Sequence, residues 1–358
     1  MKKIITTIAA AIIVALMGLF FPEAEPETPV VTTPAVTTPI SGNGLTIHFI
    51  DVGQADCALL ECDGEFMIID GGNVGDGQLV VSYLQQMGVE TLEAVVCTHA
   101  HEDHVGGLPA VLSVFDAETV YAPVTEYDTK VFRDFVAKTE ANAGKITVPA
   151  PGDRFTLGSA AVTVLGPVKE YDDPNNTSIV LKVTYGESDF LFTGDMEVEA
   201  ENDMLDHWGD GMNWESEVLK VGHHGSDTSS GYRFVYKVNP GYGVISVGED
   251  NDYGHPHEEP LSRLKDAGLL IFRTDELGHV IAKTDGKDIT FTWENQNAAP
   301  EDAEPADPAM KILYGNKKSK TFHAYDCKSL PGESNRVELP DYDTAIAEGY
   351  KPCGSCIG

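Results

Sequence analysis

Glu93-Ala-Val-Val-Cys-Thr-His-Ala-His-Glu-Asp-His-Val-Gly-Gly107 is the stretch that decides how this chain folds. Its apolar run, Ala94 to Cys97, predicts a short buried strand, and the two final glycines let the backbone turn into a helix. Four candidate metal ligands follow the strand: His99, His101, Asp103 and His104. Imidazole suits zinc and similar metals, and a carboxylate adds the negative charge that a second cation needs. Because alternation on a strand end points His99 and His101 the same way, the stretch predicts a metal site rather than a polar loop.

Length and charge limit the classes of function that the chain can have. Its 358 residues can bury one large core and a small appendage. With 24 Lys and Arg against 57 Asp and Glu, the formal charge is −33, which repels polyanions. Binding to nucleic acid through a basic face is therefore disfavoured, although a metal cluster could still attract a phosphate locally.

The N-terminal segment has the form of an export signal. Lys2 and Lys3 precede an apolar run that ends at Phe21, so residues 1–21 are a cleaved signal peptide or a retained membrane anchor. Residues 22–44 are rich in Pro, Thr and Glu and predict an extended stalk. We therefore expect an extracellular or cell-surface protein, with the N-terminal segment as its possible attachment to the envelope.

Residues 45–296 alternate between strand-like and helix-like patterns, which predicts one mixed α/β domain. The predicted strands are Thr46–Phe49, Ala58–Glu61, Phe66–Ile69, Ala94–Cys97, one at Val120, Ala161–Leu165, Ser178–Tyr185 and Phe190–Phe192. The predicted helices are Asp76–Met87, Leu108–Phe115, Thr129–Asn142 and Leu261–Ala267. Periodicity alone indicates no more than this mixed class.

The motifs of this region resemble those of metallo-β-lactamase-fold hydrolases, and within them the ComEC/Rec2-type competence hydrolases. Besides the histidine stretch, the resemblance is carried by Phe49-Ile-Asp-Val-Gly-Gln-Ala-Asp56, Ile69-Asp-Gly-Gly72, Asn175-Asn-Thr-Ser-Ile-Val180, Thr193-Gly-Asp195, Lys220-Val-Gly-His-His-Gly-Ser226 and Tyr253-Gly-His-Pro-His257. It implies an αββα sandwich, in which two sheets lie between helical layers. It also implies a hydrolytic site with two divalent cations, zinc or manganese.

The expected ligand sets follow from this resemblance. His99, His101 and Asp195 would hold one metal, with Asp195 bridging to the other. The second metal would take Asp103, His104, Asp195 and one residue of the His223-His224 pair. Adjacent residues on an extended chain face opposite ways, so we expect only one of that pair to be a ligand, and the sequence does not distinguish them. Asp103 would also orient the attacking hydroxide, so Asp103 and His224 are candidate catalytic residues as well.

Several further residues are candidates for contacts with metal or substrate. Asn175 or Asn176 stands where many relatives place a third histidine, unless both asparagines only turn the chain. Asp56 lies in a turn expected beside the metals, where Asp51 could be a cap, and Ser226 could hold a ligand or touch substrate. The candidates for phosphate or leaving-group contacts, unless their loop is merely solvated, are His255 and His257. His279 is expected to be structural, and no role is assigned to His48 or His207.

The cysteines fall into two groups. Cys57, Cys62 and Cys97 are expected to be buried apolar residues, with a Cys57–Cys62 disulfide as the alternative. After a linker at 297–309, residues 310–358 carry H-x3-C and C-x2-C, a competent tetrahedral zinc set. Its four ligands would be His323, Cys327, Cys353 and Cys356. This module resembles the zinc-binding domain of the Ada DNA-repair regulator, but His323 replaces the methyl-accepting cysteine, so methyl transfer is not expected. A disulfide among the three cysteines is the alternative.

These observations predict an exported, metal-dependent phosphodiesterase or nuclease acting on extracellular DNA. Envelope polymers with phosphocholine or teichoic-acid diesters are the alternative substrates, and a non-catalytic surface-binding protein is the alternative class. β-Lactam hydrolysis is disfavoured because the position of the third histidine and the flanking motifs differ.

Overall fold

The computed structural model describes residues 44–301, 313–324, 327–340, 342–354 and 357. The expected signal, almost all of the stalk, most of the linker and Cys356 lie outside these ranges. Within the described residues, no helix is long and apolar enough to cross a membrane.

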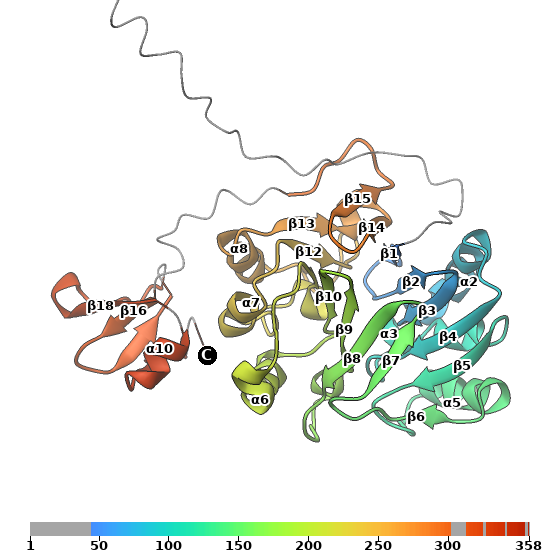
Figure 1. The fold of residues 1–358 in the computed structure, drawn as a ribbon, viewed down its shortest axis with the longest axis horizontal. Coiled ribbons are helices and arrows are strands. Elements are labelled where there is room, and N and C mark those ends of the chain that lie inside the picture. Colours follow the sequence, from blue (N-terminus) through green and yellow to red (C-terminus); the bar gives the residue numbers. More distant parts are fainter. Residues whose placement is uncertain (1–43, 302–312, 325–326, 341, 355–356, 358) are drawn as a thin grey trace, which may run out of the picture. The chain divides into compact units, whose positions relative to one another are not determined.

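Residues 44–301 contain two sheets whose strands come mainly from the two sequence halves of this region (Figure 1). The first sheet has eight strands, in the order β15 (Ile289–Trp293), β14 (Val280–Thr284), β1 (Leu45–Phe49), β2 (Ala58–Cys62), β3 (Glu65–Ile69), β4 (Thr91–Val96), β5 (Asp116–Tyr121) and β6 (Ile146–Thr147). The second has seven, in the order β13 (Leu270–Arg273), β12 (Tyr242–Ile245), β11 (Val218–Lys220), β10 (Ser188–Phe192), β9 (Val180–Tyr185), β8 (Ala160–Gly166) and β7 (Arg154–Leu157).

Alternation along the strands explains why the two sheets pack face to face. In β4, Ala94 and Val96 point into the core between the sheets, whereas Val95 points into the core beneath the helices. The rings of Phe49 in β1 and Phe192 in β10 stack across the first of these cores, 5.9 Å apart. Fully burying one such ring contributes about 1.5–3 kcal/mol, so the inter-sheet core is a major source of stability.

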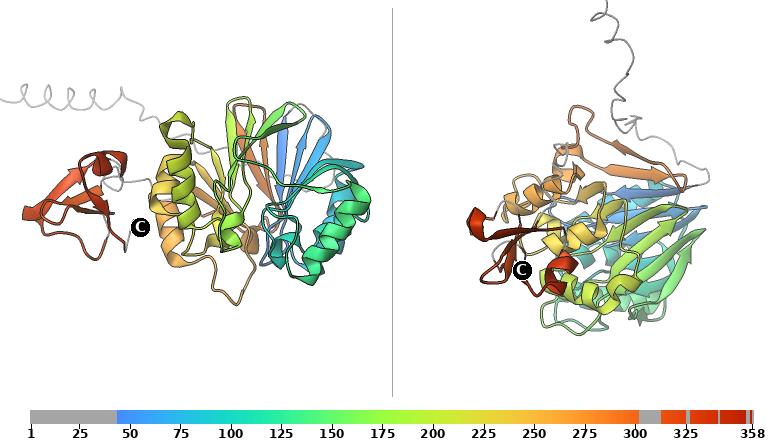
Figure 2. Two further views of the ribbon diagram at one scale, coloured as in Figure 1. Left: turned by 90° about the horizontal axis from the view of Figure 1, so that it is seen from below. Right: turned by 60° about the vertical axis from the view of Figure 1, so that its left-hand side comes forward.

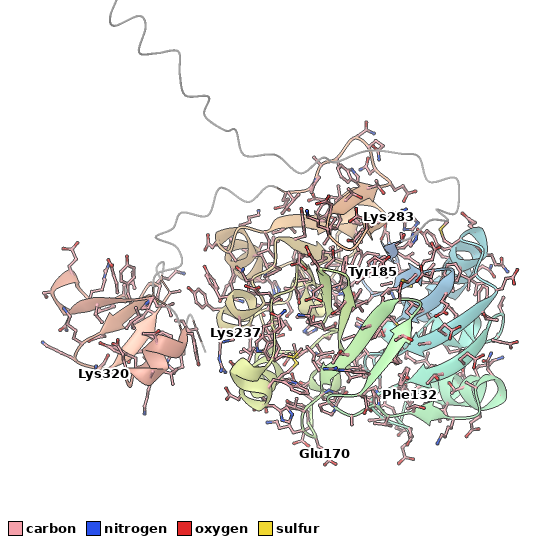
Figure 3. All side chains as sticks on the ribbon, viewed as in Figure 1. Phe132, Glu170, Tyr185, Lys237, Lys283 and Lys320 are labelled. Atoms are coloured by element: carbon pink, nitrogen blue, oxygen red, sulfur yellow. The ribbon has the colours of Figure 1, made fainter. Side chains whose placement is uncertain are left out.

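Helices cover the outer faces of both sheets, as the left-hand view of Figure 2 shows for residues 44–301. The first sheet packs against α2 (Gly77–Gln86), α4 (Leu108–Val111) and α5 (Lys130–Asn142). The second packs against α6 (Val198–Trp208), α7 (Tyr232–Val238) and α8 (Glu258–Asp266). Phe132 of α5, labelled in Figure 3, is fully buried in the core beneath the helices of the first sheet. The predicted αββα sandwich is therefore confirmed.

Most of the predicted elements are present, and the differences have simple causes. The expected helix at 108–115 is only α4, which ends at Val111 and continues as turns. Short elements such as β7 and α9 (Thr274–Leu277) carry too few residues for a periodic signal. The fold also continues past residue 296, because Glu301 pairs with Ile271 of β13 through two backbone hydrogen bonds.

The C-terminal module has its own small sheet. Its four strands have the order β18 (Arg336–Leu339), β16 (Leu313–Asn316), β17 (Thr321–His323) and β19 (Lys351–Pro352), and α10 spans Tyr342–Ala347. A few buried apolar side chains fill it, among them Leu313, Phe322 and Leu339. So small a core contributes little stability, which leaves room for a metal to contribute.

Candidate metal centre

The candidate site lies at the carboxyl ends of parallel strands from both sheets. Strands β3 and β4 run parallel in the first sheet, and β10, β11 and β12 run parallel in the second. Because carboxyl ends of parallel strands meet at one edge, the residues after these five strands come together. Short 3-10 and helical turns continue the chain there, with η2 (Asn175–Thr177), α3 (Glu102–Val105) and η4 (Gly222–Gly225) contributing side chains.

Glycines hold the histidine loop against the end of β3. The Gly71 N–H donates to the His104 carbonyl at 2.7 Å. A Cβ added at Gly107 would lie only 2.1 Å from the Gly71 oxygen, and one at Gly106 would lie 2.4 Å from Asn73 carbon. The two glycines therefore permit a close backbone approach that any side chain would prevent.

His99 and His101 form one half of the site. Their ring nitrogens Nε2 and Nδ1 are 3.0 Å apart, and His99 Nε2 lies 3.9 Å from Asp195 Oδ2. His99 is fully buried, so its position is set by packing rather than by solvent. The structure thus brings together the three residues expected to share one metal.

Four residues form the other half: Asp103, His104, Asp195 and His224, whose ligand atoms all lie within 4.8 Å of one another. His104 Nε2 is 3.2 Å from Asp195 Oδ1, and His224 Nε2 is 3.3 Å from Asp103 Oδ2. Asp195 therefore stands between the two halves, with one oxygen toward His104 and the other toward His99 and His224.

Three converging atoms of this half are buried without a hydrogen bond: His104 Nε2, Asp195 Oδ1 and His224 Nε2. A buried polar atom without a partner is costly, so such atoms call for another occupant. Imidazole nitrogens and carboxylate oxygens are the donors that zinc and manganese accept. The residues present therefore fit a divalent cation.

Buried acceptors behind the histidines orient their rings. Asp70 accepts from His104 Nδ1 at 2.8 Å and from the Thr98 hydroxyl and N–H at 2.7 Å each. His224 Nδ1 donates to the Ser246 carbonyl at 2.9 Å. With the proton on Nδ1 in both rings, each Nε2 keeps its lone pair for a metal.

The metal-free protein holds protons where cations would bind. Burial lowers the pKa of His224, but the carboxylates of Asp195 and Asp56 outweigh it and raise that pKa to about 10. Burial raises the pKa of Asp195, yet His104 and His224 hold it well below its usual range. Metal binding must displace protons from this cluster, so its affinity for metal decreases as the pH is lowered.

The expectation that only one residue of the His223-His224 pair faces the metals rested on an extended chain, and this premise is wrong. Both residues have left-handed backbone conformations, with φ of 50° and 54°. Their Nε2 atoms lie 3.7 and 3.6 Å from Asp195 Oδ2. His224 is buried within the cluster, whereas His223 is 21% exposed and also faces Glu197 Oε1 at 3.5 Å. Backbone strain of this kind is typical of functional sites.

The two asparagines have different surroundings. Asn176 Oδ1 accepts from the Glu197 N–H at 3.0 Å and therefore holds the backbone. Asn175 Nδ2 lies 3.5 Å from Glu197 Oε1, while its Oδ1 is buried without a hydrogen bond. Only Asn175 offers an unused oxygen. The hydroxyl groups of Ser226 and Thr228 form a hydrogen bond at 3.1 Å, which stabilises the turn after the histidine pair.

The mouth loop, residues 248–257, places its histidines beside the cluster. The ring of His255 lies 5.6 Å from that of His223. Gln54 fixes it, because Gln54 Oε1 accepts from the Gly248 N–H at 3.1 Å and its Nε2 faces His255 Nδ1 at 3.3 Å. His257 Nδ1 accepts from the Asp227 N–H at 3.0 Å, so His257 supports the loop.

The remaining predicted residues are placed as follows. Asp51 accepts from the Gly53 N–H at 3.0 Å and so caps its turn, while His279 accepts from the Asp51 N–H at 2.9 Å. Asp56 lies 3.3 Å from His224 Nδ1. His48, for which no role was expected, bonds to the Tyr83 hydroxyl at 2.9 Å.

Sequence reasoning missed the individual roles of Asp70, Lys220 and Ser246. The first two stood within quoted motifs, so the signal was present, but nothing in it distinguished them from their neighbours. Ser246 carries no sequence signal, because a backbone carbonyl can come from any residue type.

The cysteines of the hydrolase region are free thiols. Cys57 packs in the core beneath the helices and Cys62 in the core between the sheets, so the alternative disulfide does not form in the structure. In the tail, ligand atoms of His323, Cys327 and Cys353 lie within 4.8 Å of one another. The fourth expected ligand, Cys356, lies outside the described residues.

The fold and the site together define a class, and comparison with known proteins agrees. The model of the metallo-beta-lactamase superfamily matches residues 50–249, so the chain belongs to that superfamily and is a metal-dependent hydrolase. It is 30% identical over 271 residues to ComE operon protein 3 of Bacillus subtilis, covering 69% of this chain and 34% of that protein.

Two further relatives match the chain at a similar level of identity. Competence protein ComA of Neisseria gonorrhoeae is 30% identical over 270 residues, covering 75% of this chain and 34% of that protein. Recombination protein 2 of Haemophilus influenzae is 27% identical over 225 residues, covering 61% of this chain and 26% of that protein. The hydrolase is thus related to competence proteins, and it spans about a third of the length of the first two. Among solved structures, the metallo-beta-lactamase fold protein YhfI from Bacillus subtilis superposes with a TM-score of 0.47 at 12% identity, covering 68% of this chain and 100% of that one.

Proposed function

We propose that this protein is a phosphodiester hydrolase that uses two divalent cations, zinc or manganese, and acts on extracellular DNA. The observation that carries the chemistry is the position of Asp195 between two groups of histidines, with buried atoms left unsatisfied. Two cations bound there would supply a hydroxide at neutral pH and stabilise charge on the phosphorus.

The residues of the chain prepare this reaction. His99, His101 and Asp195 would hold one cation, and Asp103, His104, Asp195 and His224 the other. Asp103 is 31% exposed, so its carboxylate is accessible to the attacking water and can orient it through a hydrogen bond. Burial and the charge of Asp195 raise the pKa of Asp103, but His104 and His224 outweigh them and lower it to about 2. Asp103 is therefore ionised at neutral pH.

His255 is suited to contact the substrate. Because the Gln54 amide donates to its Nδ1, the neutral ring carries its proton on Nε2 and can donate to a phosphate or leaving-group oxygen. Burial and the neighbouring histidines lower the pKa of His255 to about 4, which keeps the ring neutral. His257 would not contact the substrate itself but would support the mouth loop that carries His255, through its hydrogen bond with the Asp227 N–H.

DNA as the substrate is supported by the relationship to competence proteins. The charge of −33 opposes the approach of a polyanion, but divalent cations in the medium would screen this repulsion. The N-terminal segment supports export, with the enzyme secreted or attached to the cell envelope.

A second candidate substrate is a phosphodiester of the cell envelope that carries a cationic group, such as phosphocholine. The mouth loop favours it. Tyr253 is 69% exposed and stacks on His255, with ring centroids 5.6 Å apart. The exposed carboxylates of Glu249, Asp250 and Asp252 lie in the same loop. An aromatic face near carboxylates attracts cations rather than polyanions.

For the tail we propose a structural zinc module of the Ada type without methyl transfer. The geometry of His323, Cys327 and Cys353 supports it, and Cys356 would complete the set. Four such ligands close a tetrahedral site and leave no position for substrate.

One assay separates these possibilities. The full chain is incubated with a nitrophenyl phosphodiester, single-stranded DNA, duplex DNA and a polymer bearing phosphocholine. We expect metal-dependent cleavage of the nitrophenyl diester and of both DNA forms, lost after chelation and in Asp103→Ala. Cleavage of the polymer without DNA would replace the nuclease by the second candidate. If the metal-loaded protein cleaves none of the four substrates, the result would favour the alternative of a non-catalytic surface-binding protein.

A further inference from the structure

We propose that Lys220 and Asp56 form a positioning pair that holds His224 in its metal-binding orientation. Lys220 ends β11, and its Nζ lies 2.8 Å from Asp56 Oδ2. Both residues are buried, at 5% relative exposure each. The Lys220 ammonium contacts Asp56 and the Val221 carbonyl, so its influence on the metal cluster would pass through Asp56.

Asp56 transmits the influence to His224. Its Oδ1 lies 3.3 Å from His224 Nδ1, the nitrogen that also donates to the Ser246 carbonyl. The Ser246 carbonyl accepts the Nδ1 proton, and the negative charge of Asp56 beside it stabilises that proton, so Nε2 is directed toward Asp103 and Asp195. A carboxylate behind a metal-bound imidazole also makes it a stronger donor.

The backbone of Asp56 joins the pair to the rest of the centre. The Asp56 N–H donates to the Asp103 carbonyl at 3.1 Å, and its carbonyl accepts from the Gly72 N–H at 2.9 Å. One residue therefore contacts the histidine loop, the turn after β3 and His224, which come from three separate motifs.

Lys220 makes a buried carboxylate possible at this place. A buried charge is tolerated only when it is paired, and Lys220 Nζ pairs with the Asp56 carboxylate at 2.8 Å. Lys220 also donates to the Val221 carbonyl at 3.1 Å. A small cavity lined by Asp56, Asp70 and Lys220, about the size of one water molecule, adjoins the pair.

A second buried pair in the same sheet provides a matched control. Lys182 Nζ of β9 lies 2.9 Å from Asp189 Oδ2 of β10, at exposures of 6% and 14%. Lys182 otherwise donates to the carbonyls of Asn213 and Glu215 at 2.8 and 2.7 Å. Both pairs stabilise the sheet, but only Lys220–Asp56 contacts a residue of the metal cluster.

The test compares two double variants of the full chain, Asp56→Asn with Lys220→Met and Asp189→Asn with Lys182→Met. Removing both charges of a buried pair is often tolerated, so folded protein is expected in each case. Metal affinity is measured by competition with a chelating dye, and the cobalt-loaded protein is examined by its visible absorption spectrum.

We expect the Asp56/Lys220 variant to lose about 10- to 100-fold in affinity for one of two metals, with a changed cobalt spectrum. The Asp189/Lys182 variant should keep the wild-type affinity and spectrum. Lys220→Arg, which retains the charge, provides a second variant and should keep most of the affinity. Unchanged affinity without the Asp56–Lys220 pair, or an equal loss in the control pair, would overturn the proposal.

The role of the pair rests on the two-cation hydrolase proposed above, yet the two can fail separately. If the wild-type chain binds metal but cleaves no phosphodiester, the proposed reaction fails while the affinity comparison still decides the role of the pair.

Discussion

The two candidate metal sites of this chain place their histidines in different electrostatic environments. His224 of the hydrolase faces buried carboxylates, and the pKa of His224 is raised to about 10. In the tail, His323 lies 3.3 Å from the sulfur of Cys327, and burial lowers its pKa. The hydrolase site accumulates negative charge for two cations and leaves positions for water and substrate. The tail site has soft donors that can enclose one zinc.

This difference separates a centre that performs chemistry from one that holds a fold. The hydrolase domain has three extended apolar cores and would remain folded without metal. The tail has one small cluster, so a metal would supply much of its stability. Each of the following experiments tests one side of this comparison.

The largest effect is expected in the tail. Replacement by Cys327→Ser should remove its zinc and unfold residues 313–357, because a zinc of this kind contributes on the order of 10 kcal/mol. Zinc content, thiol counting and limited proteolysis of the full chain measure the result. Hydrolase activity should persist. A wild-type chain that has no zinc in the tail and four reactive thiols after denaturation, instead of six, would establish the disulfide alternative.

The next effect concerns catalysis. Asp195→Ala removes the carboxylate between the two histidine groups, so we expect phosphodiesterase activity to fall by about 100-fold or more. The melting temperature of the tail should not change. Asp134→Ala, at an exposed position of α5, is the control for removal of an aspartate. Equal activity in the two variants would mean that the hydrolase centre is not where the reaction occurs.

A smaller effect is expected for the residue that orients His104. Asp70→Asn weakens the acceptor of the His104 Nδ1 proton and should lower metal affinity about 10- to 100-fold. Equilibrium dialysis at several metal concentrations measures this change. The zinc of the tail should be retained in the same sample, which makes it an internal reference. Full retention of metal in the hydrolase site would show that packing alone orients His104.

The smallest effect is a pH dependence of the hydrolase fold. Burial raises the pKa of Glu201 to about 7, although the Ser230 and Gly231 N–H groups and Arg263 lower it. A carboxyl with a raised pKa stabilises the fold below its unfolded value of 4.5, and this contribution is lost as pH rises through 7. The slope is at most about 1.4 kcal/mol per pH unit.

Urea unfolding of the metal-free protein between pH 5 and 8 tests this linkage. Glu201→Gln should flatten the pH dependence, and Glu199→Gln, an exposed position of the same helix, should leave it unchanged. Parallel curves for wild type and Glu201→Gln would assign the pH dependence to the histidine cluster instead.

The sequence by itself determined what depends on neighbouring residues. The apolar run Ala94 to Cys97 predicted a short buried strand, and the spacing of His99, His101, Asp103 and His104 predicted a metal loop directly after it. The spacing of H-x3-C and C-x2-C in the tail predicted a second set of candidate ligands. These features were predictable because a strand, a turn or a ligand pair is encoded within a few residues.

Only the tertiary structure decided which residues meet from distant parts of the chain. Asp56 and Lys220 are 164 positions apart, yet their charged groups pair at 2.8 Å because the two sheets face each other. The orientation of His223 and His224 likewise depended on a left-handed turn that no periodicity encodes. Local pattern specifies the direction of a side chain within one element. Distances between elements follow from the order of the strands and from the packing of the sheets.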